Sequence, residues 1–300
     1  MPLSLNAISQ DLCSGPWRSV FKGQGMEFDE VRQYQWGDDV RLIDRNVSAR
    51  YAHSVNARPW IKLYREEREV SVFMLIDCSA SMSTGAGPVS RRDQAARAAA
   101  ILALSAERLG SSLGAVSFAG DLVRVLPAAK GRHQVLEVLR AALEGGAAPF
   151  SSTATEPSRP LGPETLGGSA LSKGLDAVSR VQRRHALVVV ISDFMAVNWE
   201  GPLARLASRH DVLALRISDP LESAFPDIGF AELCDVETGA LARAATGSSS
   251  FAAAWARWNE DHRAYMAGQC ARYGVRFVEL STIDDPFLVL HEKLQRRPQP

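Results

Sequence analysis

Two strongly apolar runs limit the folds that this chain can adopt. The runs are VSVFMLI at residues 70–76 and ALVVVI at residues 186–191. Short β-rich runs with at most one polar residue predict strands that are buried on both faces. Such strands are typical of parallel sheets covered by helices on both sides, which places the chain in the α/β class.

Helical patterns alternate with strand patterns along the rest of the chain. Helices are expected at residues 92–109, 131–143, 170–184 and 251–272, and further strands at residues 113–118, 122–127, 212–217 and 275–280. Ala-Gly-Asp between two of these strands predicts a hairpin. The alternation predicts an open, doubly wound and mostly parallel central sheet of Rossmann-like architecture.

The first part of the chain has a different composition. Residues 1–69 hold eight of the 22 aromatic residues, whereas a disordered tail is poor in aromatics. We therefore expect an N-terminal extension at residues 1–69 that is packed on a sheet domain at residues 70–300. GDDVR at residues 37–41 contains adjacent carboxylates, and we expect a charged network there that docks the extension on the domain.

Charge and cysteine content exclude several classes of function. The chain has 34 basic and 34 acidic residues, so its formal net charge is zero, and a nucleic-acid partner is not expected. Its four cysteines form no CxxC pair, which argues against a zinc knuckle or a redox motif. No signal peptide and no apolar run of about 20 residues is present, so we expect a cytoplasmic protein that is not inserted in a membrane.

Both apolar runs are followed by an aspartate at the predicted end of the strand. Asp77 follows the first run directly, and Asp193 follows the second run one residue later. Ligands of open α/β sheets bind beyond the carboxyl ends of the strands, so these carboxylates are expected side by side. Ser79 and Ser81 alternate in the turn after Asp77, and Ser169 follows two glycines at the start of a helix.

These five side chains offer oxygen ligands alone, namely two carboxylates and three hydroxyls. Such a set suits a hard cation, Mg²⁺ or Mn²⁺. Neutral hydroxyls leave positive charge on the ion, so an open position can take a carboxylate from a partner protein. A second interpretation stays open, in which Ser169 is a helix N-cap and Asp193 caps a turn.

Three short motifs resemble a known metal site. DCSAS at residues 77–81, GGSAL at 167–171 and ISDF at 191–194, in that order, resemble the metal-ion-dependent adhesion site of von Willebrand factor A domains. The resemblance implies a von Willebrand A-like fold. It also implies a metal site formed by Asp77, Ser79, Ser81, Ser169 and Asp193. A serine stands at position 169, where such domains usually carry threonine.

A longer resemblance covers roughly residues 25–245. Its pieces are GMEFDEVRQYQWGDDVRLID at 25–44, SARY at 48–51, DPLESAFP at 219–226 and DVETGAL at 235–241. They resemble the domain-of-unknown-function-58 family, although Arg45 stands where tryptophan is usual. This resemblance implies a von Willebrand A-like fold and, often, an encoded neighbour of the MoxR-type AAA+ ATPase class.

The expected function is a non-enzymatic, metal-ion-dependent protein-interaction module. Its expected role is that of an adaptor or co-chaperone that binds a MoxR-type AAA+ ATPase, or a client of that ATPase, through an acidic side chain of the partner. The alternative is a Mg²⁺-dependent hydrolase that acts on a phosphate ester through Asp77 and Asp193. The chain has no GK[ST] phosphate loop, and no general base or cationic clamp stands near the motifs.

Overall fold

The structure is a computed structural model. It describes residues 22–50, 59–69, 71–120, 122–144, 170–234 and 241–295. The chain divides into a unit of residues 22–70 and a larger unit that includes residues 71–300. Each unit is described by itself.

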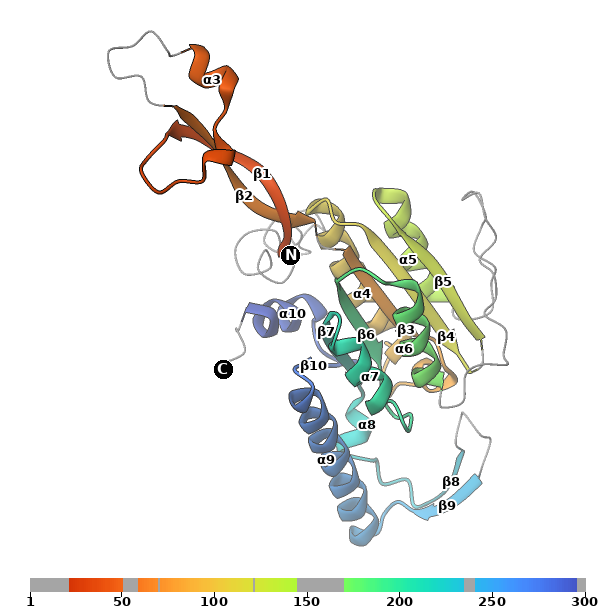
Figure 1. Ribbon diagram of the computed structural model, residues 1–300. Coiled ribbons are helices and arrows are strands. Elements are labelled where there is room, and N and C mark those ends of the chain that lie inside the picture. The colour runs from red at the N-terminus through yellow and green to blue at the C-terminus, as the bar shows by residue number, and fades with distance from the viewer. Residues whose placement is uncertain are drawn as a thin grey trace, which may run out of the picture. The chain divides into compact units, whose positions relative to one another are not determined.

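A six-stranded sheet forms the centre of the larger unit (Figure 1). Its order is β10-β7-β6-β3-β4-β5, with every neighbouring pair parallel except β4 and the edge strand β5. The strands are β3 (Ser71–Asp77), β4 (Leu113–Ala119), β5 (Leu122–Ala129), β6 (Ala186–Ser192), β7 (Asp211–Ser218) and β10 (Arg276–Ser281). The α/β class and the mostly parallel sheet predicted from the apolar runs are confirmed.

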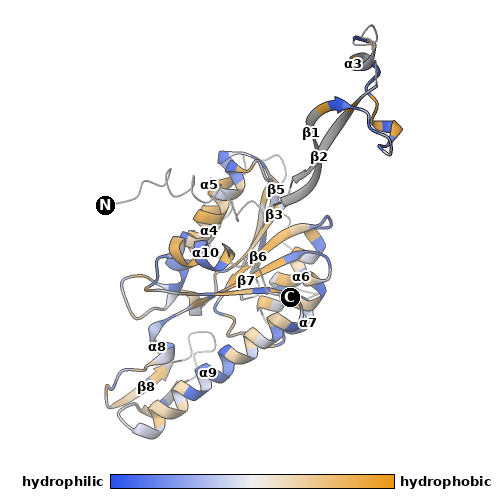
Figure 2. Ribbon diagram, turned by 90° about the vertical axis from the view of Figure 1, so that its left-hand side faces the viewer, coloured by the Kyte–Doolittle hydropathy of each residue, from blue (hydrophilic) through white to orange (hydrophobic). Residues whose placement is uncertain are grey.

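Helices cover both faces of this sheet. They are α4 (Arg91–Arg108), α5 (Arg132–Glu144), α6 (Ala170–Val181), α7 (Glu200–Ala207), α9 (Ser249–Arg272) and α10 (Pro286–Gln295). On one face α4 packs against β3, β4 and β7 and contacts α5 and α10. On the other face Phe73 and Leu75 of β3 join a core with residues of α6, α7 and α9. The sheet is therefore covered on both faces, as in doubly wound folds, and its strands are largely apolar in Figure 2.

Shorter elements follow the carboxyl ends of the strands. A 3₁₀ helix, η2 (Ala80–Ser83), follows β3, and one helical turn, α8 (Pro220–Ser223), follows β7. β8 (Phe230–Cys234) and β9 (Leu241–Ala245) form a separate antiparallel pair before α9. Two of these elements, η2 and α8, surround the candidate site described below.

The smaller unit is an antiparallel hairpin with two short helices. It contains β1 (Lys22–Gln33), η1 (Val40–Leu42), α3 (Arg45–Arg50) and β2 (Trp60–Glu69). Asp38 accepts two hydrogen bonds from Arg32, at 2.8 and 2.9 Å, which hold the pKa of this half-buried carboxyl below its ordinary value. Asp39 caps η1. These contacts of GDDVR are internal to the hairpin, and the docking of the extension on the sheet stays a prediction.

The order of the strands creates a switch point between β3 and β6. From β3 the chain continues to β4 and β5 on one side, whereas from β6 it continues to β7 and β10 on the other. Connections that run to opposite sides leave a crevice at the carboxyl ends of the two central strands, where ligands of open α/β sheets bind.

The packing of α6 on the sheet gives a test of this architecture. A Cβ atom at Gly174 would lie 2.8 Å from Phe118 Cδ1 and 2.9 Å from Leu75 Cδ1, and both neighbours are fully buried. We expect Gly174→Ala to lower the free energy of unfolding by about 1–3 kcal/mol through overpacking.

Gly268 in α9 is the matched control, because no atom lies within 4 Å of a Cβ built there. Gly268→Ala should raise stability by about 0.5–1 kcal/mol through helix propensity. Chemical denaturation of both variants measures the difference, and equal effects would contradict the close approach of α6.

Candidate functional site

Two side chains meet across the switch point. Asp77 is the last residue of β3 and Ser192 the last residue of β6. The parallel register pairs Ile76 with Ile191, so the next residues along each strand are neighbours. Ser192 Oγ donates a 2.6 Å hydrogen bond to Asp77 Oδ2. Asp77 ends β3 and Asp193 directly follows β6, so the two aspartates lie at the ends of adjacent strands, as predicted.

The turn after β3 brings two more hydroxyls to this point. Asp77 Oδ1 accepts hydrogen bonds from the backbone N–H of Ser79 at 2.9 Å and from Ser79 Oγ at 2.6 Å. Ser79 Oγ lies 3.1 Å from Ser81 Oγ. Asp77 and Ser79 are buried, with 4% and 8% of their surface exposed. The alternation Asp-x-Ser-x-Ser thus gathers one carboxylate and two hydroxyls at the end of the strand.

Asp193 holds a carboxylate oxygen that lacks a partner. Its Oδ1 accepts a hydrogen bond from the backbone N–H of Met195 at 3.0 Å. Its Oδ2 is buried and has no hydrogen-bond partner in the described part of the chain. Burying a carboxylate oxygen without a partner is unfavourable in free energy by on the order of several kcal/mol. This oxygen is therefore the observation that points to a missing ligand.

The backbone after Asp193 is unusual. Phe194 has a φ of 57°, in the left-handed region that non-glycine residues rarely adopt. Its N–H donates to Ser192 Oγ at 3.0 Å, so Ser192 links this turn to Asp77. Strained backbone of this kind concentrates at functional sites, where surrounding contacts hold it in place.

Two carboxyl groups share this buried region, and the pKa of Asp77 reflects it. Burial and, next to it, the nearby carboxyl group of Asp193 together raise the pKa of Asp77 to about 7, although the hydrogen bonds from Ser192 and Ser79 act in the opposite direction. A bound cation would favour the ionised form of both carboxylates. The donor set, with two carboxylates and neutral hydroxyls, fits a hard divalent ion.

One predicted ligand, Ser169, is not described by the structure. Ser169 lies outside the described residues, so both its ligand role and its N-cap role stay predictions. Among the described residues no group of three or more His, Cys, Asp or Glu side chains is arranged for a metal. The metal site that the sequence motif predicts uses hydroxyl ligands beside the two carboxylates, and it stays a prediction.

Three residues near the site were not identified from the sequence. Ser192 could have been noticed as a hydroxyl between an apolar strand and Asp193. Arg91 and Arg92 open α4, and their guanidinium groups donate to main-chain carbonyls of the loop after Asp77. No local pattern marks these arginines, because their partners lie seven or more residues away.

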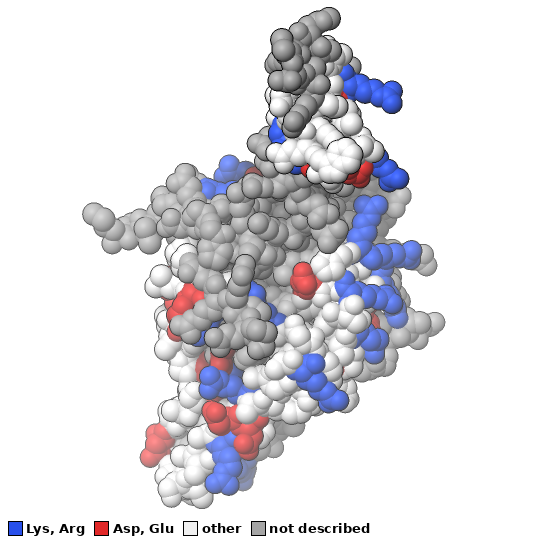
Figure 3. Space-filling model, turned by 60° about the vertical axis from the view of Figure 1, so that its left-hand side comes forward, with Lys and Arg blue, Asp and Glu red and all other residues white. Residues whose placement is uncertain are grey.

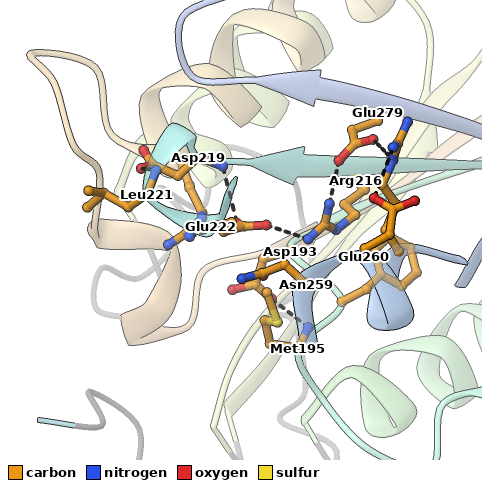
Figure 4. Close-up of polar contacts among 12 residues, drawn as sticks. Asp193, Met195, Arg216, Asp219, Leu221, Glu222, Asn259, Glu260 and Glu279 are labelled. Atoms are coloured by element: carbon orange, nitrogen blue, oxygen red, sulfur yellow. Dashed lines mark hydrogen bonds and ion pairs between the residues drawn. The ribbon is translucent and has the colours of Figure 1, made fainter. Parts of the chain in front are cut away.

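A pocket with several charged side chains in its lining lies beside the site, at the carboxyl ends of β7 and β10. It has a volume of about 620 Å³, and its lining includes Arg216, Glu222, Asn259, Glu260 and Glu279. Arg216 is almost fully buried and pairs with both Glu222 and Glu279 (Figure 4). Figure 3 shows acidic and basic side chains close together in the lower part of the face in view. Most charged side chains that line the pocket therefore form ion pairs with one another.

Comparison with known proteins assigns the chain to a family. The model of the family described as Protein of unknown function DUF58 matches residues 30–265. The chain belongs to the DUF58 family. This DUF58 chain is 33% identical over 272 residues to an uncharacterized protein of Mycobacterium bovis and to Uncharacterized protein Rv1480 of Mycobacterium tuberculosis. Each match covers 90% of the chain and 79% of the relative.

Two solved structures of low similarity also match. An aerotolerance-related membrane protein from Bacteroides fragilis is 15% identical, with 75% of this chain and 98% of that chain covered and a TM-score of 0.41. An uncharacterized membrane spanning protein from Vibrio fischeri is 14% identical, with 74% and 95% covered and a TM-score of 0.22.

The cytoplasmic location expected from the sequence is withdrawn as a correction; the two matched proteins are themselves described as membrane proteins. The expectation used the absence of a signal peptide and of a long apolar run, which says little about membrane association. Among the described helices none combines the length and the apolar character needed to cross a bilayer.

The raised pKa of Asp77 predicts how the stability of the metal-free protein depends on pH. The folded value of about 7 lies above the ordinary 3.8, so the folded state holds a proton that the unfolded state has lost. In EDTA the free energy of unfolding should therefore fall as pH rises from about 4 to about 7, by about 1.4 kcal/mol for each pKa unit between the two states.

Asp77→Asn removes this titration and is the comparison that isolates it. The difference in unfolding free energy between wild type and Asp77→Asn, measured by urea denaturation across this pH range, should change steadily with pH. A constant difference would contradict the buried, protonated state of Asp77.

Proposed function

We propose that this DUF58 protein is a metal-ion-dependent protein-interaction module with a von Willebrand factor A-like site at the β3–β6 switch point. The observation that carries the proposal is the buried, unpartnered Oδ2 of Asp193 beside the Asp77–Ser79–Ser81 turn. Asp77, Ser79, Ser81 and Asp193 would hold Mg²⁺ or Mn²⁺, together with Ser169. When bound, the ion supplies positive charge that an acidic side chain of a partner balances.

The hydrogen bonds at the site support this assignment of roles. Both oxygens of Asp77 already accept hydrogen bonds from Ser79 and Ser192. Asp77 is therefore fixed in orientation, and it also orients the Ser79 hydroxyl. Carboxylates fixed by such contacts pre-organise neutral ligands, which keeps the positive charge of an ion available to an incoming carboxylate.

Binding fits the site better than phosphate-ester hydrolysis. Phosphoryl transfer uses cationic groups that stabilise charge on the phosphate oxygens. The two guanidinium groups beside the turn, of Arg91 and Arg92, donate to main-chain carbonyls, and Arg91 also pairs with Glu222. These arginines are engaged in holding the protein, which favours a binding role for the site.

The proposed partner is a MoxR-type AAA+ ATPase or a client of that machine. This part of the proposal comes from the family resemblance, which implies such an ATPase as an encoded neighbour. The chemistry of the site adds the requirement that the partner present an aspartate or glutamate to the open position.

Metal binding is tested by thermal unfolding. Mg²⁺ or Mn²⁺ should raise the melting temperature, because a ligand that binds the native state stabilises it by about 2.7 kcal/mol at a hundredfold excess over Kd. Asp77→Ala should remove the shift. Asp176→Asn is the control, because Asp176 pairs with Arg205 on other helices. Equal shifts in wild type and Asp77→Ala would place the ion elsewhere.

Partner binding is tested with purified components. A complex with the ATPase or its client should form in Mg²⁺ and dissociate in EDTA, and Ser79→Ala should weaken it. Losing one charge-assisted contact at an interface typically weakens binding by about 2–5 kcal/mol. Ser83→Ala, at an exposed hydroxyl in η2, is the matched control.

Equal retention of the partner in EDTA and by Ser79→Ala would rule the site out as the docking point, whatever the result of the metal titration.

A further inference from the structure

The loop between Asp77 and α4 is held by two successive arginines. Arg91 Nη1 donates to the hydroxyl of Thr84 and, at 3.4 Å, to the carbonyl of Ser81. Arg92 Nη2 donates to the carbonyls of Cys78 at 3.1 Å and of Ser79 at 3.4 Å. The carbonyls of both candidate ligand residues therefore accept hydrogen bonds from the first turn of α4.

Arg91 is itself held in place by Glu222, a residue far from it in the sequence. Its Nη2 donates to Glu222 Oε1 at 2.8 Å, and the other oxygen of Glu222 pairs with Arg216 (Figure 4). The side chains of Arg91, Glu222 and Arg216 are 13%, 8% and 3% exposed. Buried pairs of this kind are screened little by solvent and lose much stability when one partner is removed. Arg91 thus connects the loop after β3 to the turn after β7.

Charge alone does not explain an arginine at this place. A guanidinium group close to a cation site repels the cation and lowers its affinity. If the arginine instead holds the loop in place, it raises the affinity for the cation. Mg²⁺ requires near-ideal ligand distances, and a loop that moves would not keep them. The two explanations therefore predict opposite effects when the arginine is neutralised.

We propose that Arg91, held in place by Glu222, is a positioning residue that sets the affinity of the site for a divalent cation. It acts by fixing the carbonyl of Ser81 and the hydroxyl of Thr84, so that the Ser79 and Ser81 hydroxyls stay in the arrangement that a cation needs. This inference rests on the proposed metal-binding function and assigns a part of that function to residues outside the ligand set.

The first test measures Mg²⁺ affinity by calorimetry. Arg91→Gln should weaken Mg²⁺ binding by about 10–100-fold, the range typical of groups that orient metal ligands. Arg91→Lys keeps the charge but cannot reach several partners with one planar group, so it should also bind Mg²⁺ more weakly than wild type. Arg97→Gln, at an exposed position of the same helix, is the control for loss of charge and should bind as wild type.

The second test uses the carboxylates of the network. Glu222→Gln removes a charged partner from both Arg91 and Arg216, whereas Glu279→Gln removes one from Arg216 and Arg263. Both variants disturb the buried network, but only Glu222→Gln removes a partner of Arg91. Glu222→Gln should therefore weaken Mg²⁺ binding more than Glu279→Gln at comparable stability in EDTA.

A third readout requires no metal. The amides of Met82 and Thr84 donate to the carbonyls of Ser79 and Ser81 at 3.2 Å. In EDTA, Arg91→Gln should speed hydrogen exchange at these two amides, while exchange in β6 stays as in wild type.

Two outcomes overturn the inference alone: wild type binds Mg²⁺ and Arg91→Gln binds it equally or more tightly, or exchange at the two amides is unchanged. Wild type that binds no divalent ion overturns the proposed function and the role of Arg91 together.

Discussion

Two carboxylates buried at the ends of adjacent parallel strands are the constraint on which the rest of the site depends. The strands are parallel and adjacent because their apolar residues require cover on both faces, and the connections then run to opposite sides of the β3–β6 pair. Asp77 and Asp193 consequently meet away from water, and their mutual repulsion must be reduced by hydrogen bonds, protonation or a cation. Ser192, between the apolar strand and Asp193, supplies the hydrogen bond that joins the two strand ends.

The hydroxyl turn and the arginines follow from that constraint. Ser79 donates to Asp77 both from its backbone and from its side chain, so the chain must turn sharply directly after the strand. A sharp turn leaves carbonyls without partners in a helix or sheet, and buried carbonyls need donors. Arg92 donates to the carbonyls of Cys78 and Ser79. Arg92 thus binds the backbone of the turn, whereas Arg91 also binds the Thr84 hydroxyl and Glu222.

The sequence predicts the local part of this arrangement and misses the long-range part. The apolar runs are sufficient for the sheet, and an aspartate at the end of each strand is sufficient to place Asp77 and Asp193 together. The Asp-x-Ser-x-Ser spacing predicts that Ser79 and Ser81 gather at Asp77, because alternate residues of a tight turn can reach one point. Contacts of Arg91 with Glu222 span 131 residues, and neither residue has a local pattern that indicates its partner. Residues 1–69 were expected to pack on the sheet from their aromatic content, but composition does not specify a surface.

The DPLE stretch at the end of β7 shows how local and long-range roles can coincide in the same side chains. Asp219 and Glu222 form a reciprocal capping box around α8, with Pro220 in its first turn. Asp219 Oδ2 also accepts hydrogen bonds from the backbone N–H of Ala86 and from Thr282 Oγ1. Glu222 also pairs with Arg91 and Arg216. A single helical turn is too short to be stable alone, so α8 depends on these outside contacts, and the loop that leads from Ser81 to α4 depends in turn on α8. Each of the two segments therefore supplies the partner that the other needs to stay ordered.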